Sequence, residues 1–304
     1  MLAVSVIIPN YNHAKYLSQR IESVLHQTFQ NFEIILLDDC STDNSRAIIE
    51  NYRNEKRISH IVYNEVNTGS TFKQWRRGLE LARGQFIWIA ESDDYAHPAF
   101  LETLIKPFYR YPDLLVSYCL SLQVDDNNHV LGEYLSMSDL DEKKWRHDYV
   151  ASSKHEFDNY LKYKNTLPNA SAVLFKNGDH LNELISEDMR YSGDWFFWQK
   201  LLQRPGKIAY TYAPLNYFRT HSHTTRSIAN ASETTERQRF KEYMSHVPFL
   251  LNPLEKRYNW MIHEWVQRRS ALKGTLSYYT TLLHPVLAIR CYLGLFKRLF
   301  IKNV

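Results

Sequence analysis

A short acidic stretch, Glu91-Ser92-Asp93-Asp94, directly follows an apolar run of the sequence. Carboxylates placed this close together repel one another, so the stretch needs water or a cation beside it. Carboxylate and water oxygens are preferred ligands of Mg²⁺ and Mn²⁺, and such a hard divalent ion suits a diphosphate. The stretch therefore predicts a metal site. The alternative is a solvated turn that caps the next helix.

A second polar group lies at Asp38 and Asp39, again after an apolar run. A carboxylate here could accept hydrogen bonds from the ring N–H of a base or from a ribose hydroxyl. Asn10 and Tyr11, which follow the first apolar run, could contact the same nucleoside, Tyr11 by stacking. Asp43 is a better candidate for capping the helix that follows it.

Basic residues occur on the helix predicted after the turn at 67–70. Lys73, Arg76 or Arg77 could pair with a phosphate or lie against a base. The alternative for Arg76 and Arg77 is a solvated helix face.

Asp194 stands at a predicted helix start, in YSGDWFFW. It could be a helix cap stabilised by the helix dipole. Flanking aromatic rings could instead desolvate it, which raises the proton affinity of a carboxylate and makes it a better general base. His221 and His223 supply imidazoles in FRTHSHTTR, and one of them could bind a metal or a phosphate.

These candidates must be positioned by the elements around them. Short, continuous apolar runs predict strands buried on both faces, and apolar residues at helical spacing lie between them. The predicted strands in the first 110 residues are 4–8, 33–37, 58–63 and 86–90. This alternation predicts a mainly parallel sheet with helices on both faces, which binds ligands beyond the carboxyl ends of its strands. Three of the polar groups fall at such ends.

The rest of the chain is less regular. Strands are predicted at 114–124, 172–175 and 215–218, and a helix at 195–202. Residues 125–149 indicate a loop or small insertion, and the pattern beyond about residue 233 is helical.

Composition favours a soluble α/β protein in a reducing compartment. The 304 residues include three widely spaced cysteines, so nothing demands a disulfide. No signal peptide precedes the first strand, and no run of eighteen apolar residues lacks charges. We therefore expect a cytoplasmic location.

Charge is unevenly distributed along the chain. Residues 237–304 contain 12 Lys and Arg against 3 Asp and Glu, although the net charge of the whole chain is only +4. Apolar residues at helical spacing within 275–304 are accompanied by basic ones, which is typical of a helix that binds the inner surface of the cell membrane. Packing on the catalytic domain or on a second subunit is the alternative.

The sequence resembles family 2 glycosyltransferases of the GT-A fold over about residues 3–225. VSVIIPNYN, DDCSTDNS, the NTGS turn, ARGQFIWIAESDDY and GDWFFWQKL carry the resemblance, in this order. It implies an α/β, Rossmann-like, mainly parallel sheet flanked by helices, and the helical pattern of the remaining residues adds a helical C-terminal extension. We therefore expect a domain at 1–228, divided into a nucleotide-binding half (1–115) and an acceptor-side half (116–228), and a helical basic region at 229–304.

The resemblance also implies a reaction. These enzymes move a sugar from a nucleotide diphosphate donor, often UDP-linked, with inversion at the anomeric carbon. The acceptor would be a hydroxyl of a glycan or lipid-linked acceptor, as in bacterial surface polysaccharide synthesis. No nucleic acid partner is implied, and a homo-oligomer is left open.

Site residues follow from the same resemblance. Asp39 matches the aspartate that contacts the base, and Pro9, Asn10 and Tyr11 match the loop around the nucleoside. Asp194 matches the general base. The stretch from Glu91 through Ser92 to Asp93 matches the metal motif, with Asp94 following, and His221 matches a histidine that reaches the metal or diphosphate in some members.

Two departures from the family pattern matter. Glu91 replaces an aspartate, so we expect Asp93 and Asp94 to bind Mn²⁺ or Mg²⁺ directly and Glu91 to lie behind them. FKQWRRG replaces the usual Ala-Arg-Asn stretch, so either Lys73 or Arg76 could take the role of the family arginine.

Two other functions compete with this hypothesis. A sugar-phosphate nucleotidyltransferase would also bind a nucleotide and a metal on a parallel sheet, but it usually carries a Gly-rich loop where this chain has PNYNHAKY. A non-catalytic nucleotide-sugar binding protein would keep Asp39 and need neither Asp93 nor Asp194.

Overall fold

The computed structural model describes residues 2–138, 140–162, 164–221, 238 and 242 of the chain. One compact unit comprises residues 1–161 and 166–221. The predicted C-terminal helical region, with the proposed membrane contact at 275–304, lies outside the described residues. None of the described helices is both long enough and apolar enough to cross a membrane.

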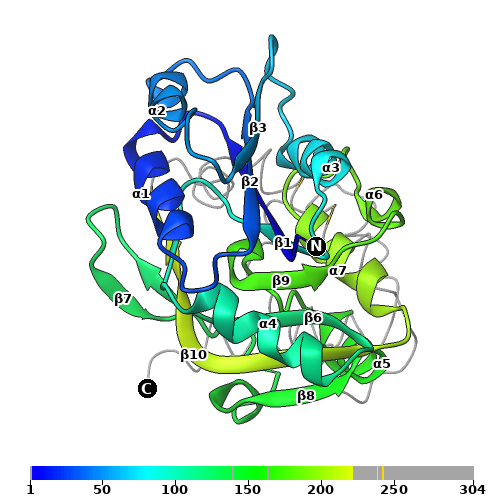
Figure 1. Ribbon diagram of the computed structural model, residues 1–304. Coiled ribbons are helices and arrows are strands. Elements are labelled where there is room, and N and C mark those ends of the chain that lie inside the picture. The colour runs from blue at the N-terminus through cyan, green and yellow to red at the C-terminus, as the bar shows by residue number, and fades with distance from the viewer. Residues whose placement is uncertain (1, 139, 163, 222–237, 239–241, 243–304) are drawn as a thin grey trace. The chain divides into compact units, whose positions relative to one another are not determined.

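A single mixed sheet forms the centre of this unit (Figure 1). Its main path runs β3-β2-β1-β4-β9-β6-β10-β5, while β7 pairs with β6 and β8 pairs with β10. The strands are β1 (Val4–Asn10), β2 (Phe32–Asp38), β3 (Ile58–Tyr63), β4 (Phe86–Ile89), β5 (Tyr95–Ala96), β6 (Leu114–Val124), β7 (Val130–Glu133), β8 (Tyr149–Ser152), β9 (Val173–Lys176) and β10 (Lys207–Arg219).

The sheet contains both parallel and antiparallel pairs of strands. The pairs β3-β2, β2-β1 and β1-β4 are parallel, as the alternating sequence predicts, and β6-β10 is also parallel. β9 is antiparallel to both of its neighbours, β4 and β6. The carboxyl ends of β1, β2 and β4 therefore meet at one edge.

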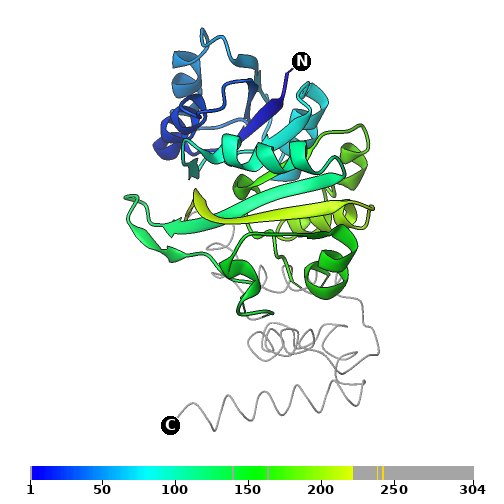
Figure 2. The same cartoon turned by 60° about the horizontal axis from the view of Figure 1, so that its bottom comes forward.

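Helices cover both faces of the sheet. The described helices are α1 (Ala14–Leu25), α2 (Ser45–Asn51), α3 (Thr71–Leu81), α4 (Phe100–Arg110), α5 (Ser153–Glu156), α6 (Leu181–Leu184) and α7 (Gly193–Leu202), with short helical turns at Lys144–Arg146, Phe157–Leu161 and Ala170–Ala172. Every residue of β1 and β2 is buried, because helices pack above and below them. Figure 2 shows α4 lying along one face of the sheet.

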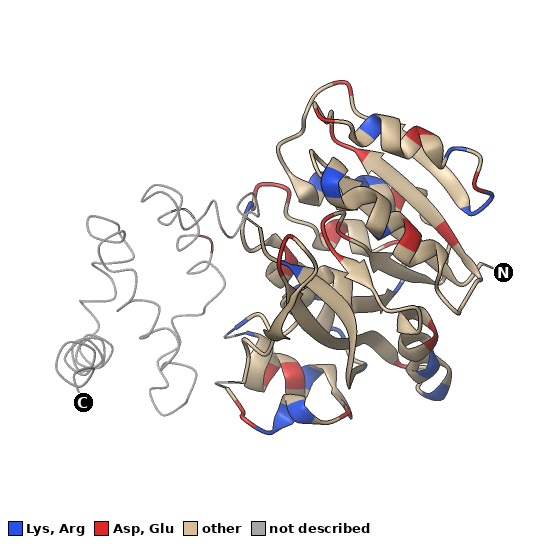
Figure 3. Ribbon diagram, turned by 90° about the vertical axis from the view of Figure 1, so that its left-hand side faces the viewer, with Lys and Arg blue, Asp and Glu red and all other residues tan. Residues whose placement is uncertain are grey.

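Alternate residues of β1 serve the two faces. Val6 and Ile8 belong to the core with α1, α2 and α4, whereas Ile7 faces α3. Gly78 lets α3 approach β1, since a β-carbon there would collide with Ile7. Lys, Arg, Asp and Glu are interspersed over the helices of the described part (Figure 3).

The predicted alternation in the first 110 residues is confirmed with one addition, the short strand β5 between β4 and α4. Two later predictions were too coarse, because tertiary pairing extends what the local pattern shows. The strand predicted at 215–218 is the end of the longer β10, and the predicted loop at 125–149 includes β7.

Candidate functional site

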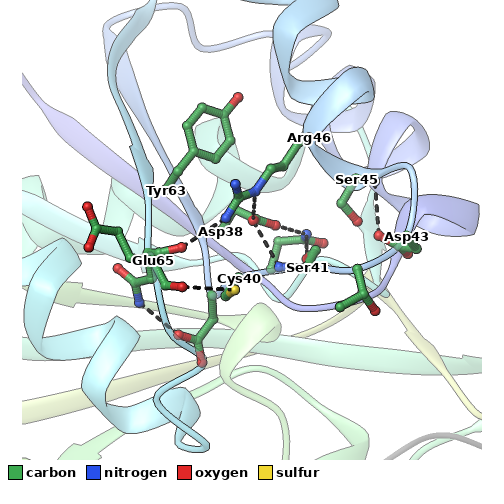
Figure 4. Close-up of polar contacts among 12 residues, drawn as sticks. Asp38, Cys40, Ser41, Asp43, Ser45, Arg46, Tyr63 and Glu65 are labelled. Atoms are coloured by element: carbon green, nitrogen blue, oxygen red, sulfur yellow. Dashed lines mark hydrogen bonds and ion pairs between the residues drawn. The ribbon is translucent and has the colours of Figure 1, made fainter.

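Asp38 anchors the loops at the carboxyl ends of β1 and β2 (Figure 4). This fully buried carboxylate accepts hydrogen bonds from Asn10 Nδ2 at 3.0 Å, from the Ser41 backbone N–H at 3.1 Å and from Arg46 Nε at 3.0 Å. Arg46 also stacks its guanidinium 5.1 Å from the ring centre of Tyr63. Asp38 therefore holds Asn10, Ser41 and Arg46 in place.

Asp39 lies beside it and is 4% exposed. Its two carboxylate oxygens accept hydrogen bonds from Asn64 Nδ2 at 2.7 Å, from Gln74 Nε2 at 3.0 Å, and from the hydroxyl (2.8 Å) and backbone N–H of Thr68. A carboxylate has about four lone-pair positions, so a base that bonds to Asp39 has to replace one of these donors.

The two loops are also tied to each other. Asn12 has a left-handed backbone conformation (φ 55°), and its side-chain oxygen accepts a hydrogen bond from the Thr42 N–H at 2.7 Å. Asp43 accepts hydrogen bonds from the N–H groups of Ala14 and Ser45, so it caps the start of α1 as well as the predicted helix α2. Tyr11 stays 45% exposed and can meet a ligand. Pro9 is buried within β1.

Glu91 begins the acidic turn after β4. Its carboxylate accepts a hydrogen bond from Trp75 Nε1 at 2.9 Å, and its carbonyl accepts one from Arg20 Nε at 2.9 Å. Burial and then the charge of Asp93 raise the pKa of Glu91 to about 8, although the bond from Trp75 opposes the shift. Glu91 is therefore held inside the turn by Trp75 and Arg20, and its place behind the metal ligands stays a prediction.

Asp93 points toward two histidines. His221 Nε2 lies 3.1 Å from Asp93 Oδ2, and the rings of His13 and His221 are 5.6 Å apart. One potential ligand atom from each of these three residues lies within 4.8 Å of the other two. Burial alone would raise the pKa of Asp93, but His13 and His221 together lower it to about 2. Imidazole nitrogens around an ionised carboxylate fit a divalent cation.

Asp94 is turned toward the protein. Its carboxylate accepts hydrogen bonds from the Arg219 N–H at 2.9 Å and from Asn169 Nδ2 at 3.1 Å, and it is 2% exposed. Burial and the charge of Asp93 raise its pKa to about 6. Its predicted role as a direct ligand stays a prediction, and these bonds show what a metal would have to displace.

Two buried guanidinium groups support the acidic turn. Arg20 on α1 donates to the Glu91 carbonyl, and Arg219 on β10 donates from Nε to the Asp93 carbonyl at 2.8 Å. Burial lowers the pKa of Arg20 to about 10, against the opposing effect of Asp94, whose Oδ2 lies 4.0 Å away. Both positive charges offset the repulsion within the turn.

Asp194 occupies the first turn of α7. Gly193, directly before it, packs so closely on α3 that a β-carbon would lie 2.5 Å from the Phe72 ring. Further along α7, Phe197 and Trp198 pack against Trp75, with ring centres 5.9 and 6.2 Å apart. Aromatic packing thus fixes the helix that carries Asp194 against α3.

The first turn of α3 joins the three candidate regions. Phe72 contacts Gly193, Gln74 bonds to Asp39, and Trp75 bonds to Glu91. Residues that are more than 100 positions apart in the sequence are therefore held around one helical turn.

The basic residues of α3 differ in their surroundings. Lys73 and Arg77 are exposed, and Arg77 pairs with Glu80 on the same helix. Arg76 forms an ion pair with Glu187, which lies on the segment before α7. Contact of Lys73 or Arg76 with the nucleotide-sugar donor stays a prediction.

Sequence reasoning missed several residues of the site, namely His13, Arg20, Gln74, Trp75 and Arg219. His13 follows the quoted PNYN stretch directly, and Arg219 lies two residues before His221. Their places near the polar groups were a usable signal. Their partners could not be inferred, because these lie in turns that are distant in the sequence.

The sequence is similar to those of known glycosyltransferases. Residues 5–166 match the family described as "Glycosyl transferase family 2". The glycosyltransferase GlyG of Streptococcus pneumoniae is 33% identical over 138 residues, which cover 45% of this chain and 41% of that protein. An uncharacterised glycosyltransferase of Haemophilus influenzae is 25% identical over 255 residues, 83% of this chain and 75% of that protein.

Solved structures agree on the fold. Residues 1–349 of Staphylococcus aureus TarS in complex with UDP-GlcNAc superpose with a TM-score of 0.61 at 19% identity, covering 97% of this chain and 91% of that one. The mannosyltransferase PcManGT of Pyrobaculum calidifontis, in complex with GDP-Man and Mn²⁺, gives a TM-score of 0.57 at 14% identity, covering 99% and 88%. The predicted GT-A fold is thereby confirmed.

Proposed function

The chain belongs to glycosyl transferase family 2, and on that premise we propose that it transfers a sugar from a nucleotide diphosphate donor, with inversion, to an acceptor hydroxyl. The observation that carries the proposal is the first turn of α3, which contacts the regions of Asp39, Glu91 and Asp194. These regions have the residue types needed to bind a nucleoside, to bind a diphosphate through a cation and to deprotonate an acceptor hydroxyl.

The donor is a UDP-sugar in this proposal. The Asp39 carboxylate supplies an acceptor for the base once the base takes the place of one of its present donors, and exposed Tyr11, on the loop that bonds to the Asp39 backbone, supplies a stacking surface. TarS was solved with UDP and with UDP-GlcNAc, which supports the same nucleotide here.

The diphosphate lies near Asp93 and His221 in this proposal. A divalent cation held by these residues would offset negative charge on the departing diphosphate. The chain's own contribution is to keep Asp93 ionised, through the neighbouring His13 and His221, and to hold its backbone in place through the bond from Arg219 to its carbonyl. Mn²⁺ is supported by its presence with PcManGT.

Asp194 is the proposed general base. Its carboxylate takes the proton of the acceptor hydroxyl while that oxygen bonds to the anomeric carbon and the bond from this carbon to the diphosphate oxygen breaks. Nucleoside diphosphate and the glycosylated acceptor are the products. The acceptor we propose is a glycan or lipid-linked glycan of the cell surface, because relatives include TarS, named as a poly(ribitol-phosphate) β-N-acetylglucosaminyltransferase, and TuaG, named for teichuronic acid biosynthesis.

Asp194→Asn tests this function. A thermal-shift screen of nucleotide sugars with Mn²⁺ first identifies the donor, and donor hydrolysis without acceptor gives a basal rate. We expect the variant to keep donor affinity, measured by calorimetry, while hydrolysis and transfer fall about 10²- to 10⁴-fold. Asp188→Asn, an exposed carboxylate on the preceding segment, is the matched control. Rates for Asp194→Asn within a few fold of wild type would refute the assignment.

A further inference from the structure

His13 joins the acidic turn from a part of the chain that carries no other candidate ligand. It lies in the loop between β1 and α1, 80 positions before Asp93 and more than 200 before His221. Its ring stands nearly perpendicular to that of His221, at 89°. A potential ligand atom from each of the three residues lies within 4.8 Å of the others.

We propose that His13 is a protein ligand of the divalent cation and that it forms, with Asp93 and His221, a set of two imidazoles and one carboxylate. The inference rests on the proposed function, because it concerns the cation that accompanies the donor diphosphate. It adds a ligand from the start of α1 to a site that the sequence assigned to the acidic turn and His221.

Ser92 supports this role by orienting the imidazole. Its hydroxyl lies 2.8 Å from His13 Nδ1 and is almost completely buried. When Nδ1 carries the hydrogen, Ser92 Oγ accepts it and Nε2 offers its lone pair to a cation. Metal-binding histidines are usually oriented by such a bond through the other ring nitrogen. Because Ser92 precedes Asp93, one turn supplies both a ligand and the group that orients a second one.

The other two carboxylates of the turn are bonded to protein groups, so the proposed ligand set has two nitrogen ligands and one carboxylate. Glu91 is bonded to Trp75, and Asp94 is bonded to Arg219 and Asn169. Asp93 is then the carboxylate of the turn that faces the histidines. Imidazole ligands favour later transition metals over Mg²⁺, which prefers oxygen. The structure therefore assigns the affinity order Co²⁺ above Mn²⁺ above Mg²⁺.

The test uses the whole chain loaded with Mn²⁺ or Co²⁺. Electron spin-echo spectroscopy of bound Mn²⁺ detects coordinated imidazole nitrogens, and calorimetry gives affinities for Co²⁺, Mn²⁺ and Mg²⁺. We expect two coordinated imidazoles in the wild type and one in His13→Ala. The affinity for Co²⁺ should fall by more than about a hundredfold, because loss of a group that only supports a ligand already costs about tenfold to a hundredfold. The affinity for Mg²⁺ should fall less.

Two controls keep the result interpretable. His26→Ala removes an exposed histidine that follows the same helix α1 and should leave every value unchanged. His13→Asn retains a side chain that can bond to Ser92, so it serves if His13→Ala unfolds. Thermal unfolding in EDTA shows whether each variant is folded.

Asp93→Asn separates this inference from the metal site itself. If Asp93→Asn loses Mn²⁺ binding while His13→Ala keeps both imidazole signals and wild-type affinity, His13 is not a ligand and the proposed function stands. If Asp93→Asn binds Mn²⁺ as the wild type does, the metal site is elsewhere, and the assignments of Asp93 and His13 both fail.

Discussion

Glu91→Gln should stabilise the metal-free protein at neutral pH. The pKa of Glu91 is raised from 4.5 to about 8, chiefly by burial and then by the charge of Asp93. In the unfolded chain this carboxyl returns to its ordinary range, so folding at pH 7 requires the uptake of a proton. Glutamine resembles the protonated acid, and its oxygen can still accept the hydrogen bond of Trp75.

The sign and size follow from linkage. A carboxyl whose pKa is higher in the folded state contributes most to stability below the unfolded pKa, and this contribution declines as pH rises from about 4.5 to about 8. At about 1.4 kcal/mol per pH unit, the loss by pH 7 is at most about 3.5 kcal/mol. Glu91 is partly exposed, which reduces the penalty, so we expect a gain of about 1 to 3 kcal/mol for the variant.

Urea unfolding in EDTA at pH 5 and pH 7.5 measures the effect. The free energy of unfolding of Glu91→Gln, relative to wild type, should rise with pH. Asp93 and Asp94 also titrate, but they are present in both proteins, so the comparison isolates Glu91. Glu80→Gln, an exposed change on α3, is the control. A difference that does not change between the two pH values would refute the reasoning.

Three further changes test how the site is held together. Gly193→Ala places a β-carbon 2.5 Å from Phe72 and should lower the unfolding free energy by about 1 to 3 kcal/mol, and an unchanged melting temperature would contradict the close packing of α3 and α7. Trp75→Phe removes the hydrogen bond to Glu91, and denaturant unfolding should show a loss of about 1 to 3 kcal/mol; a loss below about 0.5 would mean that this bond is unimportant. Arg219→Lys keeps the charge but cannot satisfy the same acceptors, so we expect a loss of about 3 kcal/mol, whereas Arg53→Ala, which breaks an exposed pair with Glu50, should destabilise the protein far less.

Much of the fold could be predicted because its first part obeys a local rule. Continuous apolar runs alternate with helical spacing, and parallel pairing then brings the ends of β1, β2 and β4 to one edge. This is why the sequence alone groups Asn10, Asp38 and the turn at Glu91. β9 and the full length of β10 depend on pairing between distant segments, which the local pattern does not encode.

The detailed roles within the site needed the structure. The sequence gives Asp38 and Asp39 the same chemistry, but Asp38 is turned toward Asn10 and Arg46, whereas Asp39 is turned toward Thr68 and α3. In the same way, Asp93 and Asp94 are neighbours whose carboxylates face different partners. Side-chain direction at a turn depends on the elements packed around it, and spacing alone does not determine it.

The first turn of α3 has a consequence for attempts to alter specificity. Gln74 and Trp75 are adjacent, so a substitution that enlarges the space beside Asp39 also disturbs the side chain that restrains Glu91. Phe72, on the same turn, packs against Gly193, so the substitution also affects the start of α7. Nucleotide preference and catalytic rate should therefore change together in engineered variants, and a successful exchange would transplant residues 67–78 as a block.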